Sequence, residues 1–540
     1  MFTIRDRLTG DLFDRWSDMS PKRRALLERS WAGVFRKHLL DELPVHELAK
    51  GLTVRVGRPS KDLHVVLGAL ILQQMFDLTD KAAVEALAFN LAWHYALDIR
   101  NESDCYFCEK TLRNYRTQVV ESGLDEVLFR HLTDKLIASF DVDTSRQRID
   151  STALRSAMRN LTRLGVVVET ISKFVRALAR LHPDLHGQVE AGIIRRYVDR
   201  EGDGCFASTM PSISRRRLSE TGPDLLGLVE QFRGTAGALL PEFALLEQVL
   251  KDQFDLSETE DAGTARRALP RAPKDIPCDT VGNPADPDAS YNARKGMGYA
   301  AQFVETYRED DAAEAGEDAP DLITHVAVHK MTVHDGHRVP DALDDLAKRY
   351  LLPERLTGDT AYGGPDNIAL ATQIGVSLVA PICSAKGRAQ GNFTLEDFVL
   401  SEDGRVARCP QGAEPVATSR SEAKLQASFD LTLCRACSEK HRCPVKPDRQ
   451  TGAAGRFQYE PSRIETRAQR LYQQSEAFHD MYRWRAGIEA SIARLKHQMN
   501  LAHLRIRGMP AMRYVTQLRA LGLNIFRCAT FVEVGRPARP

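Results

Sequence analysis

Apolar residues at helical spacing dominate the first part of the chain. In residues 63–76 they recur every three or four positions, and Pro59 with Ser60 gives a start signal before them. A later helical stretch ends at Gly123, a residue typical of helix stops. The pattern predicts a small all-α domain over residues 1–140. A DNA-binding helix-turn-helix fits this pattern but is not specific to it.

Beyond residue 140, short β-like segments alternate with helices, which is typical of an α/β core. The first strand is followed by a long helical stretch whose apolar residues recur every three or four positions. The predicted elements are a strand at 146–150, helices at 153–182 and 223–254, a connector at 256–290, strands at 298–307 and 321–333, a helix at 339–351, a strand leading to residue 359, a helix at 367–375, a strand at 376–382 and helices from 472 to 531.

These elements predict two domains, and 540 residues are indeed too many for one hydrophobic core. The all-α domain covers 1–140, and an α/β domain covers 141–540. We expect the second domain to be interrupted by a helical insertion over 153–275 and by a loop-rich, cysteine-rich insertion over 384–465.

Composition argues against several classes of protein. The chain is 43% apolar and 27% charged, an ordinary globular mixture. The first residues do not form a signal peptide, and the longest apolar run is far too short to span a membrane. Ten unevenly placed cysteines do not indicate a secreted disulfide framework. We expect a soluble cytoplasmic protein without a membrane partner.

Charge is concentrated near the C-terminus. The net charge of the chain is only +1, but the segment from Arg483 to Arg539 has eleven basic and two acidic residues. A basic end on a neutral protein indicates a local site for an anion, and a solvated helix face is the alternative. The basic residues are Arg483, Arg485, Arg494, Lys496, Arg505, Arg507, Arg513, Arg519, Arg527, Arg536 and Arg539.

Two aspartates stand at the ends of predicted strands. Asp150 and Asp359 would face the crevice where α/β sheets bind ligands, although aspartate also commonly leaves a strand into a turn. A polar stripe on a predicted C-terminal helix favours a ligand-binding role for these aspartates over a role in a turn. Its residues follow at offsets of 3, 4 and 7 and fall within roughly 60° of one face, although a surface salt-bridge ladder would look similar. They are Tyr482, Arg485, Glu489 and Lys496.

This complete Tyr-Arg-Glu-Lys spacing resembles the signature of one branch of the DDE-type transposases of bacterial insertion sequences. Segments 148–157 and 357–367 resemble the first and second aspartate segments of that family, and 298–306 resembles the strand between them. Segment 57–80 resembles its helical N-terminal domain. One departure is Ala361, because relatives often have glycine before the tyrosine.

The resemblance implies a ribonuclease H-like catalytic fold in which Asp150, Asp359 and Glu489 bind two Mg²⁺ ions, for which Mn²⁺ can substitute. It also implies that Tyr482, Arg485 and Lys496 contact DNA near the scissile phosphate. Two metal ions activate the attacking oxygen and stabilise the leaving oxygen, and Mg²⁺ prefers carboxylate ligands. By charge and position, Arg505 and Arg507 can extend the same DNA track.

The expected substrate is double-stranded DNA, as terminal inverted repeats and as target. Water would attack first, and the freed 3′-hydroxyl would then join the target. We expect a nucleoid-associated bacterial enzyme that brings two ends together as a homodimer. The alternatives are a ribonuclease H-like nuclease that cuts without joining, and a decayed transposase that only binds DNA.

Four cysteines lie in the loop-rich segment, and two of them form a Cys-x-x-Cys pair. Four thiolates in such a segment predict a structural Zn²⁺ site, with His441 able to replace the last cysteine. An iron–sulfur cluster and the absence of any metal are the alternatives. Similar four-cysteine inserts occur in the resembling family. The pair Cys105 and Cys108 predicts buried thiols rather than a site. The four cysteines are Cys409, Cys434, Cys437 and Cys443.

Overall fold

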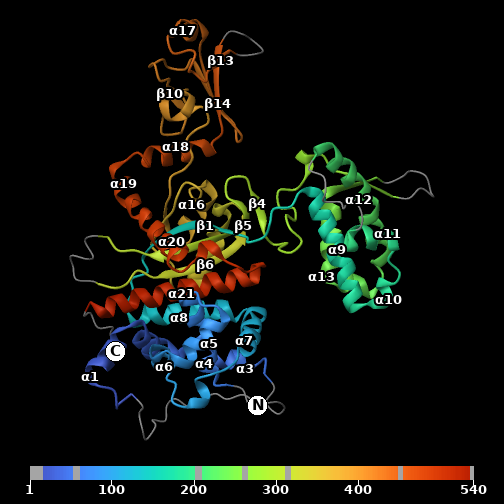
Figure 1. The fold of residues 1–540 in the computed structure, drawn as a ribbon. Helices are drawn as coiled ribbons and strands as arrows, with labels where there is room; N and C mark the ends of the chain where they lie inside the picture. The colour runs from blue at the N-terminus through green and yellow to red at the C-terminus, as the bar shows by residue number, and fades with distance from the viewer. Residues whose placement is uncertain are drawn as a thin grey trace.

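The computed structural model describes residues 16–52, 61–200, 210–257, 266–309, 318–447 and 454–534 (Figure 1). The predicted start signal at Pro59 and Ser60, and the basic residues Arg536 and Arg539, lie outside these ranges. The described chain is a mixed α/β protein, as predicted. A helical N-terminal region packs below a central sheet, and two further parts project from that sheet.

The N-terminal region is helical because its apolar residues follow helical spacing and its ends are capped. Helix α4 is buried along its whole length and begins after Asp62, whose side chain accepts a hydrogen bond from the His64 N–H. Helix α7 ends at Gly123 with φ of 70°, which confirms the predicted stop. The helices are α1 (Pro21–Arg29), α2 (Trp31–Val34), α3 (Val45–Ala49), α4 (Leu63–Met75), α5 (Asp80–Phe89), α6 (Leu91–Ala96), α7 (Glu109–Ser122) and α8 (Leu124–Ser139).

The central sheet has the strand order β4-β5-β1-β7-β8, and β6 also pairs with β5, along the edge opposite β1. Strand β1 is antiparallel to β5 and parallel to β7, so the sheet is mixed. Helices α15 (Val339–Lys348) and α16 (Pro365–Gln373) connect its later strands. The strands are β1 (Arg146–Arg155), β4 (Ser290–Asn292), β5 (Gly296–Thr306), β6 (Ile323–Lys330), β7 (Arg355–Thr357) and β8 (Ser377–Val379).

The C-terminal helices return the chain to this sheet. They are α18 (Ser462–Tyr472), α19 (Glu476–Tyr482), α20 (Gly487–His497) and α21 (Met509–Glu533). Helix α21 lies between the sheet and the N-terminal helices α4 and α8 (Figure 1). One continuous hydrophobic cluster therefore joins the N-terminal region, α21 and the sheet.

The chain between β1 and β4 forms a helical insertion with its own hydrophobic core. Its first helix starts at Arg163, not at residue 153 as predicted, because β1 stays paired with β5 up to Arg155 and Thr162 caps the helix. The predicted helix over 223–254 is instead two helices, and Pro223 lies inside the first. The elements are α9 (Arg163–Leu181), α10 (Pro183–His186), α11 (Ala191–Ile193), α12 (Pro211–Phe232), α13 (Pro241–Gln253), β2 (Phe254–Ser257) and β3 (Arg267–Pro270).

The cysteine-bearing segment contains more regular structure than its sequence predicted. Its strands form a sheet in the order β11-β12-β14-β13 and a short β9-β10 hairpin, around a small apolar core. This part projects above the central sheet (Figure 1). Its elements are β9 (Val399–Leu400), β10 (Val406–Arg408), β11 (Ala417–Arg420), β12 (Leu425–Asp430), α17 (Leu431–Ala436), β13 (Lys446–Pro447) and β14 (Ala454–Tyr459).

Candidate active site

Asp150 lies within β1, whereas the sequence predicted that it would lie at the end of the strand. The strand continues because its pairing with β5 extends to Arg155, but its parallel pairing with β7 stops at Arg148. Asp150 therefore lies just beyond the paired edge of the parallel strands. Its Oδ1 accepts a hydrogen bond from the Ser151 N–H at 2.7 Å.

Asp359 lies in the turn that follows β7, as predicted. Its Oδ1 accepts a hydrogen bond from the Ala361 N–H at 2.8 Å, and its carbonyl accepts one from the Tyr362 N–H at 3.0 Å. Gly358 before it packs so closely that a Cβ there would lie 2.9 Å from the Tyr362 ring. Since β7 runs parallel to β1, this turn opens toward the same edge of the sheet as Asp150.

Glu489 lies in the first turn of α20, and its side chain is 60% exposed. The predicted single helix is interrupted, because Tyr482 ends α19 and residues 483–486 form a tighter 3₁₀ turn. The Tyr482 ring stacks on Phe478 at 5.5 Å between ring centres. The polar residues of the stripe thus come from three short consecutive elements.

Arg485 connects two of the predicted acids. Its guanidinium donates to Asp150 Oδ2 at 2.8 Å and to Glu489 Oε1 at 2.7 Å. Burial raises the pKa of Asp150, and the negative charges of Asp359 and Glu489 raise it further against the opposing charge of Arg485. The three acids are therefore close enough to interact electrostatically, although they are far apart in the chain.

The same acids stabilise the positive charge of Arg485. Burial disfavours this charge, but Asp150 and Glu489 outweigh burial and raise the pKa of Arg485 above its usual value. Burial also raises the pKa of Tyr482, which adjoins the same charges. Within the described ranges, no three His, Cys, Asp or Glu side chains are placed to hold a metal ion.

Lys496 lies beside further cations. Burial lowers the pKa of Lys496, and the neighbouring positive charges of Lys295 and Arg155 lower it further. Arg155 ends β1, and Lys295 lies in the turn between β4 and β5. No ion pair involves these three cations in the described part of the chain.

A buried ion-pair network that the sequence analysis missed connects α20 to the sheet. Glu305 on β5 is fully buried and binds Arg148 on β1 at 2.7 Å and Arg527 on α21 at 3.1 Å. Arg148 also donates to the Trp484 carbonyl at 3.0 Å, and Arg527 donates to the Ser491 hydroxyl. The network thus contacts the chain before Glu489, at Trp484, and after it, at Ser491.

The spacing of Arg148 and Asp150 was the only available signal for this network. Residues two apart on a strand point to the same face, so an arginine at that position lies beside the acid. Its partners Glu305 and Arg527 lie 157 and 379 residues away and could not be identified from local sequence.

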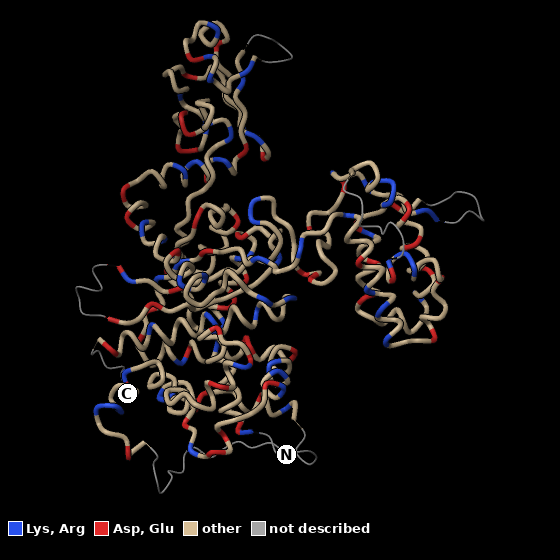
Figure 2. The backbone as a smooth tube through the Cα atoms, in the orientation of Figure 1, with Lys and Arg blue, Asp and Glu red and all other residues tan. Residues whose placement is uncertain are grey.

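The basic C-terminal segment is only in part a surface. Three of its arginines form ion pairs with the folded core, Arg513 with Asp125, Arg519 with Asp77 and Arg527 with Glu305. These three arginines therefore add little to an exposed excess of positive charge, whereas the ion pairs of Arg485 are with the candidate site acids Asp150 and Glu489. Arg505 and Arg507 are exposed in the turn before α21. Lys and Arg are spread over all parts of the molecule (Figure 2).

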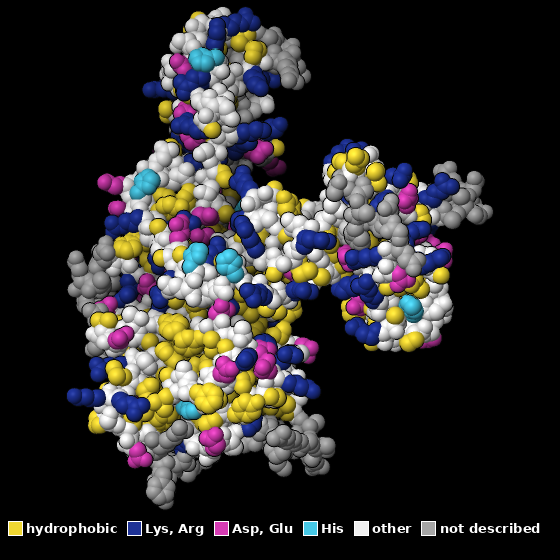
Figure 3. Space-filling model, in the orientation of Figure 1, with side chains coloured by type: hydrophobic (Ala, Val, Ile, Leu, Met, Phe, Trp, Pro, Cys, Tyr) yellow, Lys and Arg dark blue, Asp and Glu magenta, His cyan; other side chains and the backbone are white. Residues whose placement is uncertain are grey.

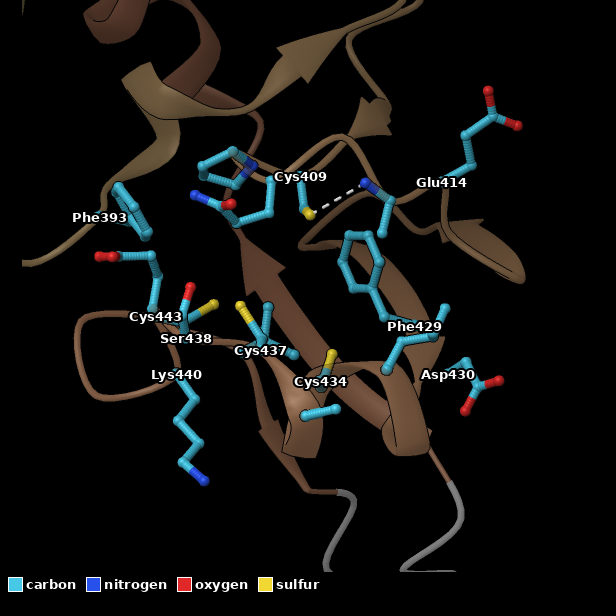
Figure 4. Close-up of a pocket in the computed structure, with 17 residues that line it drawn as sticks. Phe393, Cys409, Glu414, Phe429, Asp430, Cys434, Cys437, Ser438, Lys440 and Cys443 are labelled. Carbon is cyan, nitrogen blue, oxygen red and sulfur yellow. Dashed lines mark hydrogen bonds between the residues drawn. The ribbon is translucent and has the colours of Figure 1, made fainter.

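The four cysteines of the projecting segment line one cavity of about 330 Å³ (Figure 4). Burial raises the pKa of Cys434 and of Cys443, and the neighbouring cysteines raise both further. The Sγ of Cys409 accepts a hydrogen bond from the Ala413 N–H at 3.3 Å. The residues that line the cavity do not include His441. They do include Cys409, Cys434, Cys437 and Cys443.

Only one thiol of the second cysteine pair is buried as predicted. Cys105 is buried, but Cys108 is exposed at the start of α7. Cys108 precedes the helix start on the surface, with its Sγ 3.3 Å from the Thr111 hydroxyl, so the prediction of two buried thiols is wrong for this residue.

Comparison with known proteins gives matches in two segments. Residues 408–529 match a family described as transposase DDE domain, and residues 31–118 match a family described as transposase domain (DUF772). The first match contains Glu489 and the four cysteines of the cavity, whereas Asp150 and Asp359 precede it. No curated protein matches the chain.

Among the described helices, none is both long and apolar enough to cross a lipid bilayer. The DDE match supports a nucleic-acid-processing enzyme, and such a family implies a DNA substrate. Together, the two matches indicate that the chain is a DDE-type transposase of an insertion element.

Proposed function

We propose that the protein catalyses Mg²⁺-dependent DNA strand cleavage and strand transfer at the ends of an insertion sequence. One observation carries the proposal. Arg485 binds both Asp150 and Glu489, and Asp359 follows the strand that is parallel to the strand of Asp150, so three acids separated by more than 100 residues in the chain meet at one edge of the sheet. Carboxylates gathered against their mutual repulsion are typical of a site that binds cations.

The topology supports a ribonuclease H-like catalytic fold. The first acid lies on the central strand β1, the second follows the adjacent parallel strand β7, and the third lies on a helix packed against β1. This arrangement places acids from three separate segments at one edge of a mixed sheet. The helical insertion and the cysteine-bearing segment leave this arrangement intact, because each enters between elements of the core.

The donor chemistry fits Mg²⁺, or Mn²⁺ in its place, because all three candidate ligands are carboxylates. Two such ions, when bound, would supply the Lewis acidity for attack by water and then by the 3′-hydroxyl. The cationic side chains of the protein would have a separate role, which is to bind DNA phosphates. Arg485 is suited to bind a phosphate with two parallel donors, and Lys496 with a single charge. Tyr482 would contact the same DNA strand.

The four cysteines support a structural Zn²⁺ site, since thiolates are preferred zinc ligands and all four line one cavity. Their side chains would have to move closer together to coordinate the ion. We expect about one Zn²⁺ per purified chain, and Cys434→Ser should lose it and become more sensitive to protease in residues 385–460. Cys383→Ser is the matched control, because Cys383 is exposed and does not line the cavity. Iron or no metal would contradict the zinc assignment.

The DNA partner would be the terminal inverted repeats and the target duplex, joined by a homodimer that holds two ends. Recognition of the ends is assigned to the N-terminal helical region. Arg505 and Arg507 are exposed at the turn before α21 and would extend the contact along the phosphate backbone.

The test is cleavage of duplexes that contain the inverted repeats flanking the gene. Asp150→Ala, Asp359→Ala and Glu489→Ala should each lower the cleavage rate at least about 100-fold without unfolding the protein. Asp366→Ala is the control, since Asp366 is an exposed acid on the next helix. Normal nicking by Asp359→Ala would refute this active site.

The two alternatives give different results in the same assay. Wild-type protein that cuts the ends but never joins them to target DNA would be a nuclease. Wild-type protein that binds the ends but does not cut them with Mg²⁺ or Mn²⁺ would be a DNA-binding relic of a transposase.

A further inference from the structure

A buried aspartate fixes the helical insertion to the candidate active site. Asp286 is fully buried and accepts hydrogen bonds from the Ser156 hydroxyl at 2.6 Å, from the Tyr299 hydroxyl and from the Gly508 N–H at 2.9 Å. Ser156 follows β1, and Gly508 ends the turn that carries Arg505 and Arg507. The base of the insertion, the end of the catalytic strand and an exposed basic turn therefore meet at one point.

Cations accumulate near this junction. Arg155 and Lys295 lie beside Lys496, and none of the three forms an ion pair among the described residues, although the negative charge of Asp150 acts on Lys496 against theirs. Such a cluster is costly unless an anion joins it. Lys and Arg side chains are visible along the connection to the insertion and on the side of the insertion that faces the body (Figure 3).

The insertion carries a groove of about 500 Å³ directly beyond this cluster. Lys173 and Arg176 of α9 line it, together with Arg159 and Arg180. The three cations on α9 are exposed and lie three and four residues apart, which places them on one face of the helix. Lys173 donates to the Pro284 carbonyl at 2.8 Å, so its ammonium is held at the groove.

The acids of the groove do not neutralise it. Glu169 and Glu242 also line it, but Glu169 is paired with Arg200 at 2.9 Å. Within the described ranges, no carboxylate forms an ion pair with any of the groove cations. The groove thus presents an excess of positive charge, on an insertion whose core is separate from that of the sheet.

We propose that this groove binds the phosphate backbone of the transposon-end DNA as it leaves the active site. The proposal rests on the proposed function, because the path starts at Arg485 and Lys496 and continues over Arg155 and Lys295. Seven residues of α9 rise about 10 Å, which is about the axial length of three nucleotides of B-form DNA. Contacts of this kind hold the duplex without reading its sequence.

The test compares Arg176→Ala/Arg180→Ala with Arg215→Ala/Arg216→Ala, which removes two exposed arginines from α12 outside the groove. Binding of the end duplex is titrated at several salt concentrations without Mg²⁺. The groove variant should bind roughly 10- to 100-fold more weakly near 0.1 M salt, with a salt slope flatter by about two contacts. The α12 variant should bind as the wild type does.

Two further binding experiments vary the length and the source of the DNA duplex. A duplex truncated to the base pairs around the cleavage point should bind wild type and groove variant equally, because it cannot reach the insertion. A deficit seen only in the capture of random target DNA, with normal binding of the ends, would overturn the assignment to end DNA.

An unchanged affinity and salt slope for the long end duplex would refute the groove altogether. Cleavage by the wild type, lost in Asp359→Ala, would in that case still support the proposed function. Failure of the groove and failure of the active site can therefore be distinguished.

Discussion

At the scale of single residues, Arg485 holds a position that a metal ion would compete for. It donates to both Asp150 and Glu489, so a cation that binds these carboxylates must displace at least one of its bonds. We predict that Arg485→Gln binds Mn²⁺ several-fold more tightly without DNA, since a partly exposed ion pair contributes up to about 1 kcal/mol, or about fivefold. The same variant should cleave DNA poorly, because it lacks a phosphate contact.

Calorimetric titration of Mn²⁺ into DNA-free protein measures this effect. Arg483→Gln is the matched control, because Arg483 lies over the Trp484 ring at 4.9 Å, whereas the bonds to Asp150 and Glu489 come from Arg485. Unchanged or weaker Mn²⁺ binding by Arg485→Gln would show that the arginine does not compete with metal.

The sequence identified the residues of this site better than their contacts. The Tyr-Arg-Glu-Lys spacing selected Arg485 and Glu489 because both lie in one local stretch, and their ion pair four residues apart follows from helical geometry. The bond from Arg485 to Asp150 spans 335 residues and depends on how α20 packs on β1. Local spacing carries no information about such packing.

At the scale of elements, the buried network around Glu305 sets the position of α20 on the sheet. A Cβ added at Gly487 would lie 2.0 Å from Arg148 Nη1, so the start of α20 packs directly against this arginine. Arg148 in turn is held by Glu305 on one side and by the Trp484 carbonyl on the other. A shift of the helix that carries Glu489 therefore breaks the hydrogen bonds that Arg148 donates to the Trp484 carbonyl and Arg527 donates to the Ser491 hydroxyl.

We predict that Glu305→Gln lowers the free energy of unfolding by about 3 kcal/mol or more, because it leaves the buried Arg148 and the partly buried Arg527 without the Glu305 carboxylate. Gly487→Ala should cost less stability but lower kcat more than it raises KM, since displacement of Arg148 moves the candidate metal ligand Glu489, whereas Arg505 and Arg507 lie outside α20 and keep their part of the DNA contact. Thermal unfolding and cleavage kinetics measure both. Ala493→Ser on the exposed side of α20 is the control, and a normal kcat for Gly487→Ala would contradict the positioning role.

Strand and helix types were predicted more accurately than their limits. Residues from Leu154 onward have helical spacing, yet β1 continues to Arg155 because β5 supplies a pairing partner 145 residues later, Leu154 opposite Tyr299. Pro223 resembled a helix start, but α12 runs through it because Leu218, Leu225 and Leu228 bury one continuous face. In both cases tertiary contacts outweighed local preference.

At the scale of the whole molecule, the two larger of the three hydrophobic cores divide the chain differently from the predicted boundary at residue 140. The N-terminal helices share a core with α21 and β6, where Leu132 and Leu521 belong to one cluster. The helical insertion has a separate core, and its two connecting segments meet at its base, where the Asn283 side chain donates to the Arg159 carbonyl at 2.9 Å.

This division predicts opposite results for two deletions. Removal of residues 1–140 should leave the catalytic part unfolded or aggregated, because it exposes the buried face of α21. Each large apolar side chain returned to water costs about 1.5–3 kcal/mol, and several of them exceed a typical net stability of about 5–15 kcal/mol. Replacement of residues 160–282 by a short glycine-rich linker between Arg159 and Asn283 should instead give a soluble protein with a near-native melting temperature.

The insertion-deleted protein should still bind Mn²⁺ and cut a short end duplex, because Asp286 and the three acids remain. Its affinity for a long end duplex should fall, as the groove on α9 is gone. Far-ultraviolet circular dichroism, thermal unfolding and size-exclusion chromatography distinguish the two deletions. A soluble, folded fragment of residues 141–540 would contradict the shared core, and deletion of residues 1–140 could then test the recognition of DNA ends. If the fragment does not fold, recognition of DNA ends is tested by substitutions of exposed residues within the matched segment 31–118.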